Sequence, residues 1–300
     1  MKIKYSNSDR VFMTFVYIIL AFSFIVVLYP LYFVVIASFS DPVLVNSGQV
    51  WFYPRGLSIQ GYSYVFRDNR IITGYINTLS YCLGYTTLTL VLTVLAAYPL
   101  SNRTLVGRRV FNFLIVFPMY FSGGLVPTYI VIRNLHLINK PILMCILGAL
   151  SAFNIIITRT YFETNIPNEL LDSAGIDGCN QAQMFTRVVL PLSKPILAVL
   201  ALYSFVGQWN SFFNAMMFLN KSQYYPLQLV LRDILLQSQS LQDSSKVQSI
   251  SDVTAAAEQQ KLADMIKYCV IVVSSAPILC IFPFFQKYFA QGIMIGAVKG

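Results

Sequence analysis

The stretch LDSAGIDGCNQAQMFTRVVLPLSKP, from Leu171 to Pro195, decides the fold of this chain. It carries two aspartates, two basic side chains, two glycines and two prolines, and it separates two long segments of almost purely hydrocarbon side chains. A charged side chain at the centre of a bilayer costs about 2.5 to 3.5 kcal/mol on insertion scales, and proline interrupts helices. The stretch therefore predicts a polar loop that joins two membrane spans.

Two short helices are predicted in this loop and just before it. In the first, Pro167 suits the beginning of a helix and Glu169 complements the helix dipole. Gly178 permits the left-handed backbone of a tight reversal. In the second helix, Asn180 is the expected N-cap and Pro191 is expected to end the helix. The loop is thus predicted to be a compact helix-turn-helix hairpin, and a position on the lipid headgroups is its simplest placement.

The composition is that of a membrane protein. Of the 300 residues, 56% are apolar and only 11% are charged, whereas about 25% are charged in an ordinary soluble domain. A helix needs about 20 apolar residues to cross a bilayer. Six apolar runs are long enough, over residues 11–40, 72–100, 110–132, 141–161, 195–219 and 264–285. We predict an all-α integral membrane protein with six transmembrane helices within 11–287, a polar loop over 162–194, and end segments 1–10 and 288–300.

The third of these runs contains four residues that interrupt or bend helices. They are Pro118, Gly123, Gly124 and Pro127. The pattern predicts a break in this helix, and a single kinked span is equally compatible with it.

The net charge of +9 does not indicate nucleic-acid binding, because the basic residues lie in short loops and at the chain ends rather than in a stripe. Such cations attract anionic lipid headgroups and set topology. The basic N-terminus and the short link RTLVGRR, residues 103–109, favour a cytoplasmic N-terminus, although the cations of the whole chain divide almost equally between the two sides. With six spans, this orientation places both termini and the polar loop in the cytoplasm.

No catalytic or metal-binding pattern is found in the sequence. The twelve acidic residues lie in loops, in terminal segments or, for Asp264, at the end of a span, and the single histidine, His136, is in a loop. The five cysteines have no metal-ligand or disulfide spacing. Neither a Walker A loop nor a hydrolase motif occurs. We therefore expect neither an enzyme nor a proton-driven transporter, and the energy for uphill transport must come from another protein.

Some uncharged polar residues do lie within the apolar runs. Those that can line a path for a neutral, hydroxyl-rich solute are Asn77, Ser80, Asn154, Trp209, Asn210 and Asn214. Amides and hydroxyls beside an aromatic face suit such a solute, because it needs both hydrogen bonds and a flat apolar surface. Hydrogen bonds between helices, with Trp209 at the membrane interface, are the simpler explanation for each residue taken alone.

The loop also matches a longer pattern: an acidic residue, a small residue, Ala, any two residues and Asp-Gly, then nine residues, an aliphatic residue, any residue and Leu-Pro. Its members here are Asp172, Ser173, Ala174, Asp177, Gly178, Val188, Leu190 and Pro191. This pattern resembles the EAA loop, the cytoplasmic signature of ABC importer permeases. Two members depart from the family pattern, since Asp172 replaces the usual Glu and Ser173 replaces the usual first Ala.

The resemblance extends over nearly the whole chain. It includes the segments AAYPLSNRTLVGRR, FSGGLVPTYIVIRNLHLIN, QWNSFFNAMMFL and FFQKYFAQGIMIGAVKG. These segments are similar to the carbohydrate branch of the permeases, the MalG-like subunits, and within it to the LplC type associated with complex oligosaccharides. The resemblance implies the type I ABC importer (MetI-like) permease fold, with the loop as a cytoplasmic coupling helix.

In that family the coupling helix docks on a separate ATPase subunit. The resemblance implies that the segment 167–191 docks here through Glu169, Asp172, Ser173, Ala174, Asp177, Gly178 and Pro191. It also implies that the C-terminal tail contacts the ATPase through Gly296 and Lys299, although a frayed terminus is the alternative. ATP and Mg²⁺ are then bound by the partner ATPase, and no cofactor is expected in this chain.

The implied assembly is an importer in the bacterial inner or plasma membrane. Its other parts are a second homologous permease, an ABC ATPase dimer and an extracytoplasmic solute-binding protein that delivers a carbohydrate. A stand-alone secondary transporter or facilitator of a neutral polar solute remains an alternative, as does an intramembrane enzyme. The sequence leaves open which sugar is carried, whether it is acidic, which ATPase and binding protein serve the complex, and the type of host.

Overall fold

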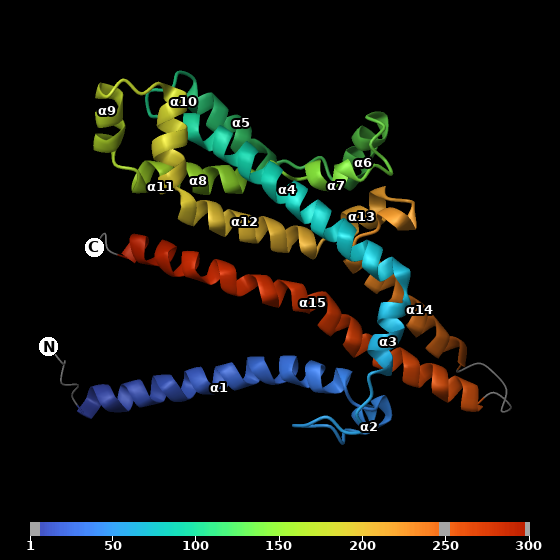
Figure 1. Cartoon of the computed structure of the whole chain (residues 1–300). Helices are drawn as coiled ribbons and strands as arrows, with labels where there is room; N and C mark the ends of the chain where they lie inside the picture. The colour runs from blue at the N-terminus through green and yellow to red at the C-terminus, as the bar shows by residue number, and fades with distance from the viewer. Residues whose placement is uncertain (1–6, 246–252, 298–300) are drawn as a thin grey trace. The chain divides into compact units, whose positions relative to one another are not determined.

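A computed structural model describes residues 7–245 and 253–297, and its elements are helices (Figure 1). No strand occurs within these two ranges. The predicted all-α class is therefore confirmed. The chain divides into two compact units, unit 1 with Met1–Asn69 and Leu231–Ala276, and unit 2 with Arg70–Val230 and Pro277–Gly300.

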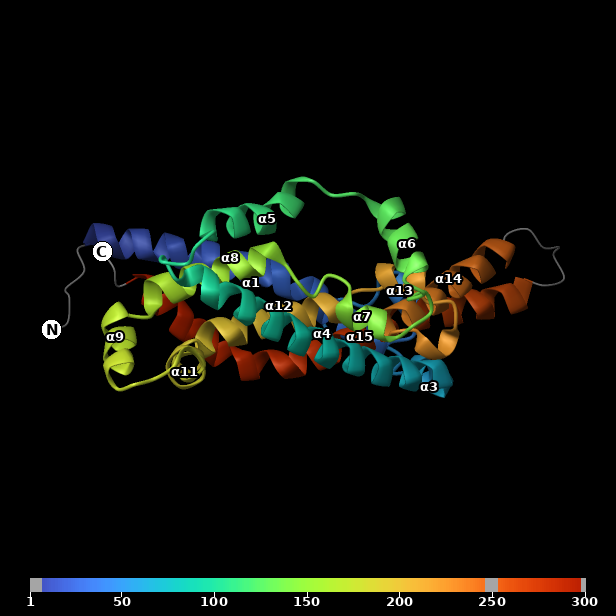
Figure 2. The same ribbon diagram turned by 90° about the horizontal axis from the view of Figure 1, so that it is seen from above.

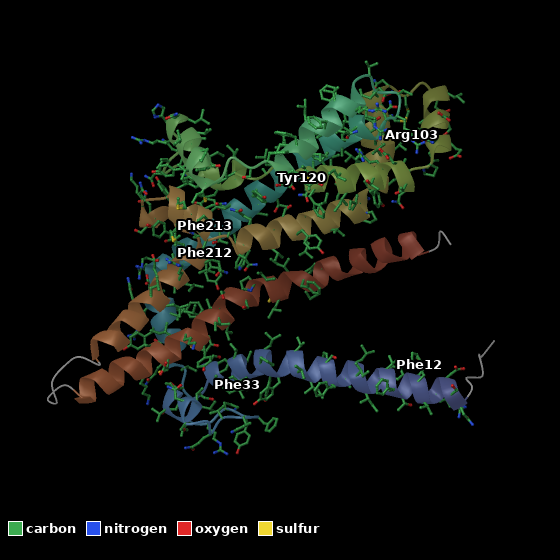
Figure 3. The ribbon with its side chains drawn as sticks, turned by 180° about the vertical axis from the view of Figure 1, so that it is seen from behind. Phe12, Phe33, Arg103, Tyr120, Phe212 and Phe213 are labelled. Atoms are coloured by element: carbon green, nitrogen blue, oxygen red, sulfur yellow. The ribbon has the colours of Figure 1, made fainter. Side chains whose placement is uncertain are left out.

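Unit 1 contains the first helices of the chain and segments near its end. Its elements are α1 (Asn7–Ser38), α2 (Pro42–Asn46), α3 (Gln60–Arg67), most of α14 (Leu227–Ser245) and the first part of α15 (Val253–Ala297). Where α1 ends, Ile36 and Ala37 are buried against Val45 and Val50 of the next segment. Most of the rest of α1 is exposed, including apolar side chains such as Phe12, labelled in Figure 3. An apolar helix of 32 residues with so exposed a surface suits a lipid environment.

Two polar contacts hold the segment after α1 against the beginning of α15. Nζ of Lys261 lies 3.0 Å from Oδ2 of Asp41, and Nδ2 of Asn46 donates to Oδ2 of Asp264 at 2.6 Å. Asp41 is also the N-cap of α2, since it accepts the N–H of Val43 at 3.0 Å. Burial alone would raise the pKa of the Asp41 carboxyl, but the bonds from Val43 and Lys261 outweigh burial and lower this pKa below its ordinary value of 3.8.

Unit 2 contains most of the remaining helices. They are α4 (Asn69–Ser101), α5 (Arg108–Tyr120), α6 (Leu125–Asn134), α7 (Ile142–Ile146), α8 (Ala152–Asn165), α9 (Asn168–Ile176), α10 (Gln181–Gln183), the π-helical turn η1 (Met184–Val189), α11 (Leu190–Leu192), α12 (Lys194–Trp209), α13 (Phe213–Phe218) and the 3-10 turn η2 (Ser222–Tyr224). Figures 1 and 2 show α9, α10 and α11 at one end of α4, with α6, α7 and α13 toward its other end.

Two separate apolar cores lie along α4, one toward each end. The core nearer α9 consists of Val94, Ala97, Leu100, Ile155, Phe162, Ile166 and Val189. The other core consists of Tyr81, Ile132, Leu143, Met144, Ala215, Phe218, Leu219 and Leu229. Because α4 contributes to both cores, it connects the two ends of unit 2.

Three helices in the described ranges are long and apolar enough to cross a membrane, namely α1, α4 and residues 263–284 of α15. They correspond to the runs predicted over 11–40, 72–100 and 264–285. Two bent pairs meet the same criteria if each is taken as one span: α5 with α6, bent by 113°, and the helix Gln181–Leu192 with α12, bent by 74°. Up to five spans are therefore found by length and composition, against six predicted runs.

The run predicted over 110–132 is a broken helix rather than a merely kinked one. Residues 121–124 are non-helical between α5 and α6. Gly124 has φ +82°, a left-handed conformation that glycine adopts at little cost. Pro118, in contrast, lies within α5 without ending it. The break was thus predicted from the glycines, whereas its 113° bend was not.

The runs predicted over 141–161 and 195–219 are also interrupted. Leu147 is extended and Gly148 has φ +81°, so the fourth run is divided between α7 and α8. The fifth run ends its main helix at Trp209, and Figure 3 labels Phe212 and Phe213 near the break before α13. Hydropathy counts apolar residues and does not report such turns, which explains why both runs were predicted as continuous helices.

Candidate functional site

The candidate site is the loop over 162–194, which forms the predicted pair of helices. Its first helix, α9, begins after Pro167, whose backbone is extended, and Glu169 lies in the first turn. Ala174 is buried, whereas Ile176 is 88% exposed. Only one side of α9 therefore packs against the rest of the chain, and most of the surface of this helix is exposed.

The exposed surface of α9 is acidic. Glu169, Asp172, Ser173 and Asp177 are all exposed, and Oγ of Ser173 donates to the carbonyl of Leu170 at 3.1 Å. None of the three carboxylates forms an ion pair with another residue of the ranges that the structure describes. Because the side chain of Ser173 is small and folded back on the helix, another backbone can approach closely. The surface suits a partner that carries basic groups.

The turn after α9 depends on one glycine. Gly178 has φ +79°, as its sequence context predicts. The N–H of Gly178 donates to the carbonyl of Gly175 at 3.1 Å, and the N–H of Cys179 donates to that of Ala174 at 3.0 Å. A Cβ at Gly178 would meet no atom within 4 Å, so the backbone conformation alone requires glycine here.

The second helix begins with a reciprocal cap. The N–H of Gln183 donates to Oδ1 of Asn180 at 2.8 Å, while the N–H of Asn180 donates to Oε1 of Gln183 at 3.0 Å. Two donors at the beginning of the helix are satisfied by this capping box. The predicted N-cap is therefore confirmed.

The prediction that Pro191 ends this helix is wrong. The chain stays helical through α10, η1 and α11, and the N–H of Leu190 donates to the carbonyl of Phe185 in the wider π-helical turn. This turn directly before the proline reduces the clash between its ring and the preceding turn. The bend toward α12 comes two residues later at Ser193, which is buried and donates its Oγ proton to the carbonyl of Val189 at 2.6 Å.

The second helix is bound to the end of α4 by one aromatic side chain. The hydroxyl of Tyr98 donates to Oε1 of Gln181 at 3.0 Å, and the rings of Tyr98 and Phe185 lie with their centroids 4.9 Å apart. Val189 of the same helix is buried in the core that contains Leu100. These contacts make a direct mechanical connection between the loop and the long helix of unit 2.

A charged cluster lies at the base of the loop. Glu163 forms ion pairs with Arg108 and, at 3.4 Å, with Arg159. Nε of Arg108 also donates to the carbonyl of Leu100 at 2.8 Å, and Arg159 donates to Oδ1 of Asn112 at 2.6 Å. The cluster therefore connects the ends of α4 and α8 to α5. This cluster was not predicted from the sequence; the four-residue spacing of Arg159 and Glu163 is the only signal that indicates part of it.

Two of the predicted path-lining residues have structural partners. Nδ2 of Asn77 donates to the carbonyls of Gln223 and Tyr225 at 2.8 and 3.1 Å. Trp209 has no exposed surface, and its ring lies 6.2 Å from that of Tyr75. In this conformation both side chains hold helices together, which is the simpler of the two explanations that the sequence allowed.

The other predicted path residues are more accessible. Ser80 and Asn210 are exposed, and Asn210 donates from Nδ2 to the carbonyl of Val206 at 3.0 Å. Asn154 and Asn214 are half-buried. Their role in lining a path stays a prediction.

The C-terminal tail is helical for most of its length. Gly296 lies near the end of α15, which extends to Ala297. Lys299, the other residue predicted to contact a partner, lies outside the described residues.

Comparison with known proteins shows extensive similarity. The sequence profile of the family described as "Binding-protein-dependent transport system inner membrane component" matches residues 5–295. The chain is 38% identical to the polygalacturonan/rhamnogalacturonan transport system permease protein YtcP of Bacillus subtilis (strain 168), over 97% of this chain and 99% of the relative. It is 35% identical to protein LplC of the same organism, over 90% and 89% respectively.

A solved structure is also similar over nearly the full length. It is the crystal structure of a bacterial ABC transporter involved in the import of the acidic polysaccharide alginate. The match has a TM-score of 0.82 and 31% sequence identity, and it covers 95% of this chain and 99% of the chain in that structure. The arrangement of helices described above is therefore shared with a membrane importer.

Proposed function

Since the chain belongs to the family of binding-protein-dependent transport system inner membrane components, we propose that it is a permease subunit of an ATP-driven importer and forms half of a translocation path for carbohydrates. The relatives are transport components rather than enzymes. Catalysis of ATP hydrolysis belongs, in this proposal, to a separate subunit. The spans α1, α4 and α15 place the chain in a membrane.

The observation that carries the proposal is the structure of the loop over 167–191. It has an acidic and almost fully exposed first helix, a turn fixed by Gly178, and a second helix bound to α4 through Tyr98. An exposed element that is also rigidly connected to a long helix can transmit movement of a bound partner. The proposed partner is a dimer of ABC ATPases, on which Asp172 and its neighbours dock, with Gly296 and Lys299 of the tail as further contacts.

The names of the relatives support a carbohydrate as substrate. One relative is a permease for polygalacturonan and rhamnogalacturonan, and the structural neighbour imports alginate, which its title describes as acidic. The galacturonic acid units of the first substrate also carry carboxylates. We therefore propose oligosaccharides that contain uronic acids as the substrate class, delivered by an extracytoplasmic binding protein to a pair of homologous permeases in the bacterial cell membrane.

Reconstitution tests this proposal. The chain is purified with its partner permease, ATPase and binding protein, and uptake of labelled tetragalacturonic acid into proteoliposomes is measured. Uptake is expected only with ATP on the cytoplasmic side and only with all partners present. Uptake by the chain alone without ATP would instead identify a stand-alone transporter and overturn the proposal.

A further inference from the structure

The charges of unit 2 are separated between its two ends. All four acidic residues in the sequence of this unit lie in the short segment 163–177, which belongs to the loop. No acidic residue occurs in 70–162 or in 194–230. A basic residue on the part of unit 2 that lies far from the loop therefore has no carboxylate side chain nearby in the sequence of unit 2.

Four basic residues are gathered on that remote part. We call them the basic turn: Arg133, His136, Lys140 and Lys221. Arg133 lies in the last turn of α6, His136 and Lys140 lie between α6 and α7, and Lys221 lies in the segment after α13. All four are exposed, and none has an ion-pair partner among the residues described.

Three hydrogen bonds of Asn139 bring the segment between α6 and α7 together with the segment after α13. Oδ1 of Asn139 accepts the N–H groups of Asn220 and Lys221, each at 3.2 Å, and the N–H of Asn139 donates to the carbonyl of Phe218 at 2.7 Å. Lys140 follows directly in sequence. Asn139 has φ +59°, a conformation that asparagine tolerates better than most residues. These hydrogen bonds fix the relative positions of the two segments that carry Lys140 and Lys221.

The basic turn lies away from the loop, beside a more N-terminal part of α4. Tyr81 of α4 donates its hydroxyl to the carbonyl of Tyr224, three residues after Lys221, whereas Tyr98 of α4 contacts the loop. Tyr98 is 17 positions after Tyr81, which corresponds to about 25 Å along a helix. This length is close to the hydrocarbon thickness of a bilayer, about 30 Å. If the loop is cytoplasmic, the basic turn is on the outer side.

The preference of basic residues for the cytoplasmic side does not explain why these cations lie on the outer side of the membrane. Lysine and arginine favour the cytoplasmic side of a membrane, so an outer cluster works against the insertion signal. Ser222 and Gln223 are exposed beside Lys221 and add a hydroxyl and an amide. Cations together with neutral hydrogen-bonding groups fit a ligand that carries both carboxylates and hydroxyls.

We propose that the basic turn receives the carboxylates of an acidic oligosaccharide at the outer mouth of the translocation path. This inference rests on the proposed function, and it assigns the acidic substrate class to named residues of this chain. Unpaired exposed cations attract an anion over a distance of about 10 Å at moderate salt. The basic turn therefore raises the local concentration of an acidic oligosaccharide at the mouth more than that of a neutral oligosaccharide of equal length.

Direct binding tests the inference. The full chain with its partner permease and ATPase is placed in nanodiscs of zwitterionic phosphatidylcholine, without the binding protein, and fluorescent tetragalacturonic acid is titrated. Binding is expected to weaken as salt is added. The double variant Lys140→Gln/Lys221→Gln is expected to bind about three- to tenfold more weakly. The matched control Arg103→Gln/Arg109→Gln removes two exposed cations near the loop and leaves binding unchanged, and neutral maltotetraose binds equally weakly to all three proteins.

Three results would overturn the inference. One is equal binding of tetragalacturonic acid by the wild type and the Lys140/Lys221 variant. A second is an effect of the variant only in nanodiscs that contain phosphatidylglycerol, which would assign the cations to lipid headgroups. A third is an effect only when the binding protein is added, which would assign them to protein docking. ATP-driven uptake by the reconstituted complex is measured separately, so failure of the proposed function is distinguished from failure of this inference.

Discussion

The hydroxyl of Tyr98 donates to Oε1 of Gln181 at 3.0 Å, and this bond joins the long helix α4 to the second helix of the loop. The ring of Tyr98 also lies against that of Phe185. Any displacement of the second helix by a bound partner therefore acts on α4 directly. Since α4 reaches both apolar cores of unit 2, it can carry this displacement across the membrane.

Replacement of Tyr98 separates the two parts of this contact. Tyr98→Phe removes the hydrogen bond, worth about 0.5–1.5 kcal/mol, and keeps the ring contact. We expect the amount of substrate taken up per ATP hydrolysed to fall about two- to fivefold, with ATPase activity retained. Both rates are measured in proteoliposomes. Tyr120→Phe is the matched control, because Tyr120 is 79% exposed, and it should behave as the wild type. Unchanged uptake per ATP in Tyr98→Phe would contradict a mechanical role for the bond.

Replacement of Glu163 removes the centre of the charged cluster at the base of the loop. Glu163→Gln leaves Arg108 and Arg159 close together without their carboxylate. The side chains are partly exposed, so we expect a loss of about 1–2 kcal/mol, seen as a fall of a few degrees in the thermal unfolding midpoint in detergent. Arg109→Gln, an exposed neighbour, should leave the midpoint unchanged.

The exchanged pair Arg108→Glu/Glu163→Arg tests whether charge is the cause. It should recover part of the lost stability, since it restores one attraction in the reverse direction. A double variant less stable than both single variants would indicate that shape rather than charge holds the cluster.

Replacement of Gly178 tests the turn. Gly178→Val places a β-branched residue at φ +79°, where L side chains are strained whatever space surrounds them. We expect transport to be abolished while membrane insertion, measured by fractionation and protease accessibility, is normal. Gly175→Ala is the control, because Gly175 is helical and a Cβ there meets nothing within 4 Å. It should transport normally, and wild-type uptake by Gly178→Val would contradict the role of the turn.

The ion pair of Asp41 and Lys261 predicts a pH dependence of unit 1. The pKa of Asp41 is lowered in the folded protein, so its stabilising contribution is fully present above the ordinary value of 3.8 and is lost as the pH falls through the lowered value. The pair is partly exposed, which limits the contribution to less than about 1 kcal/mol. Asp41→Asn should therefore lower the unfolding midpoint slightly at pH 7, and the difference from wild type should shrink as the pH falls below 3.8 and disappear once the pH is below the lowered pKa of Asp41. A difference that is constant from about pH 3 to about pH 7 would exclude the carboxylate as its cause.

Features that depend on neighbouring residues could be predicted from the sequence. The left-handed Gly178 and the Asn180 cap follow from interactions over three or four residues, and both are present. The long helices α1 and α4 follow from uninterrupted apolar runs. The likeness of the loop to a family signature predicts the family correctly, because the signature is a local pattern of residue types at fixed spacing.

Features that depend on distant residues could not be predicted in this way. Arg108 and Glu163 are 55 residues apart, and no local pattern indicates that they meet. Pro191 fails to end its helix because of the π-helical turn before it, which no residue type specifies. The division of the fourth run at Gly148 depends on one backbone angle. Trp209 is buried by Tyr75 and Phe205, and only the second of these lies near it in the sequence.

The most direct test of the account is a cross-link from the tip of α9. Ile176 is 88% exposed, so a photoreactive benzoylphenylalanine in its place disturbs little of the chain itself. In inverted membrane vesicles that contain the whole complex, irradiation is expected to join this position to the ATPase subunit, and Asp172→Lys in the same chain is expected to reduce the yield. A cross-link to lipid or to the extracytoplasmic binding protein, with none to the ATPase, would contradict the claim that this loop couples ATP hydrolysis to transport.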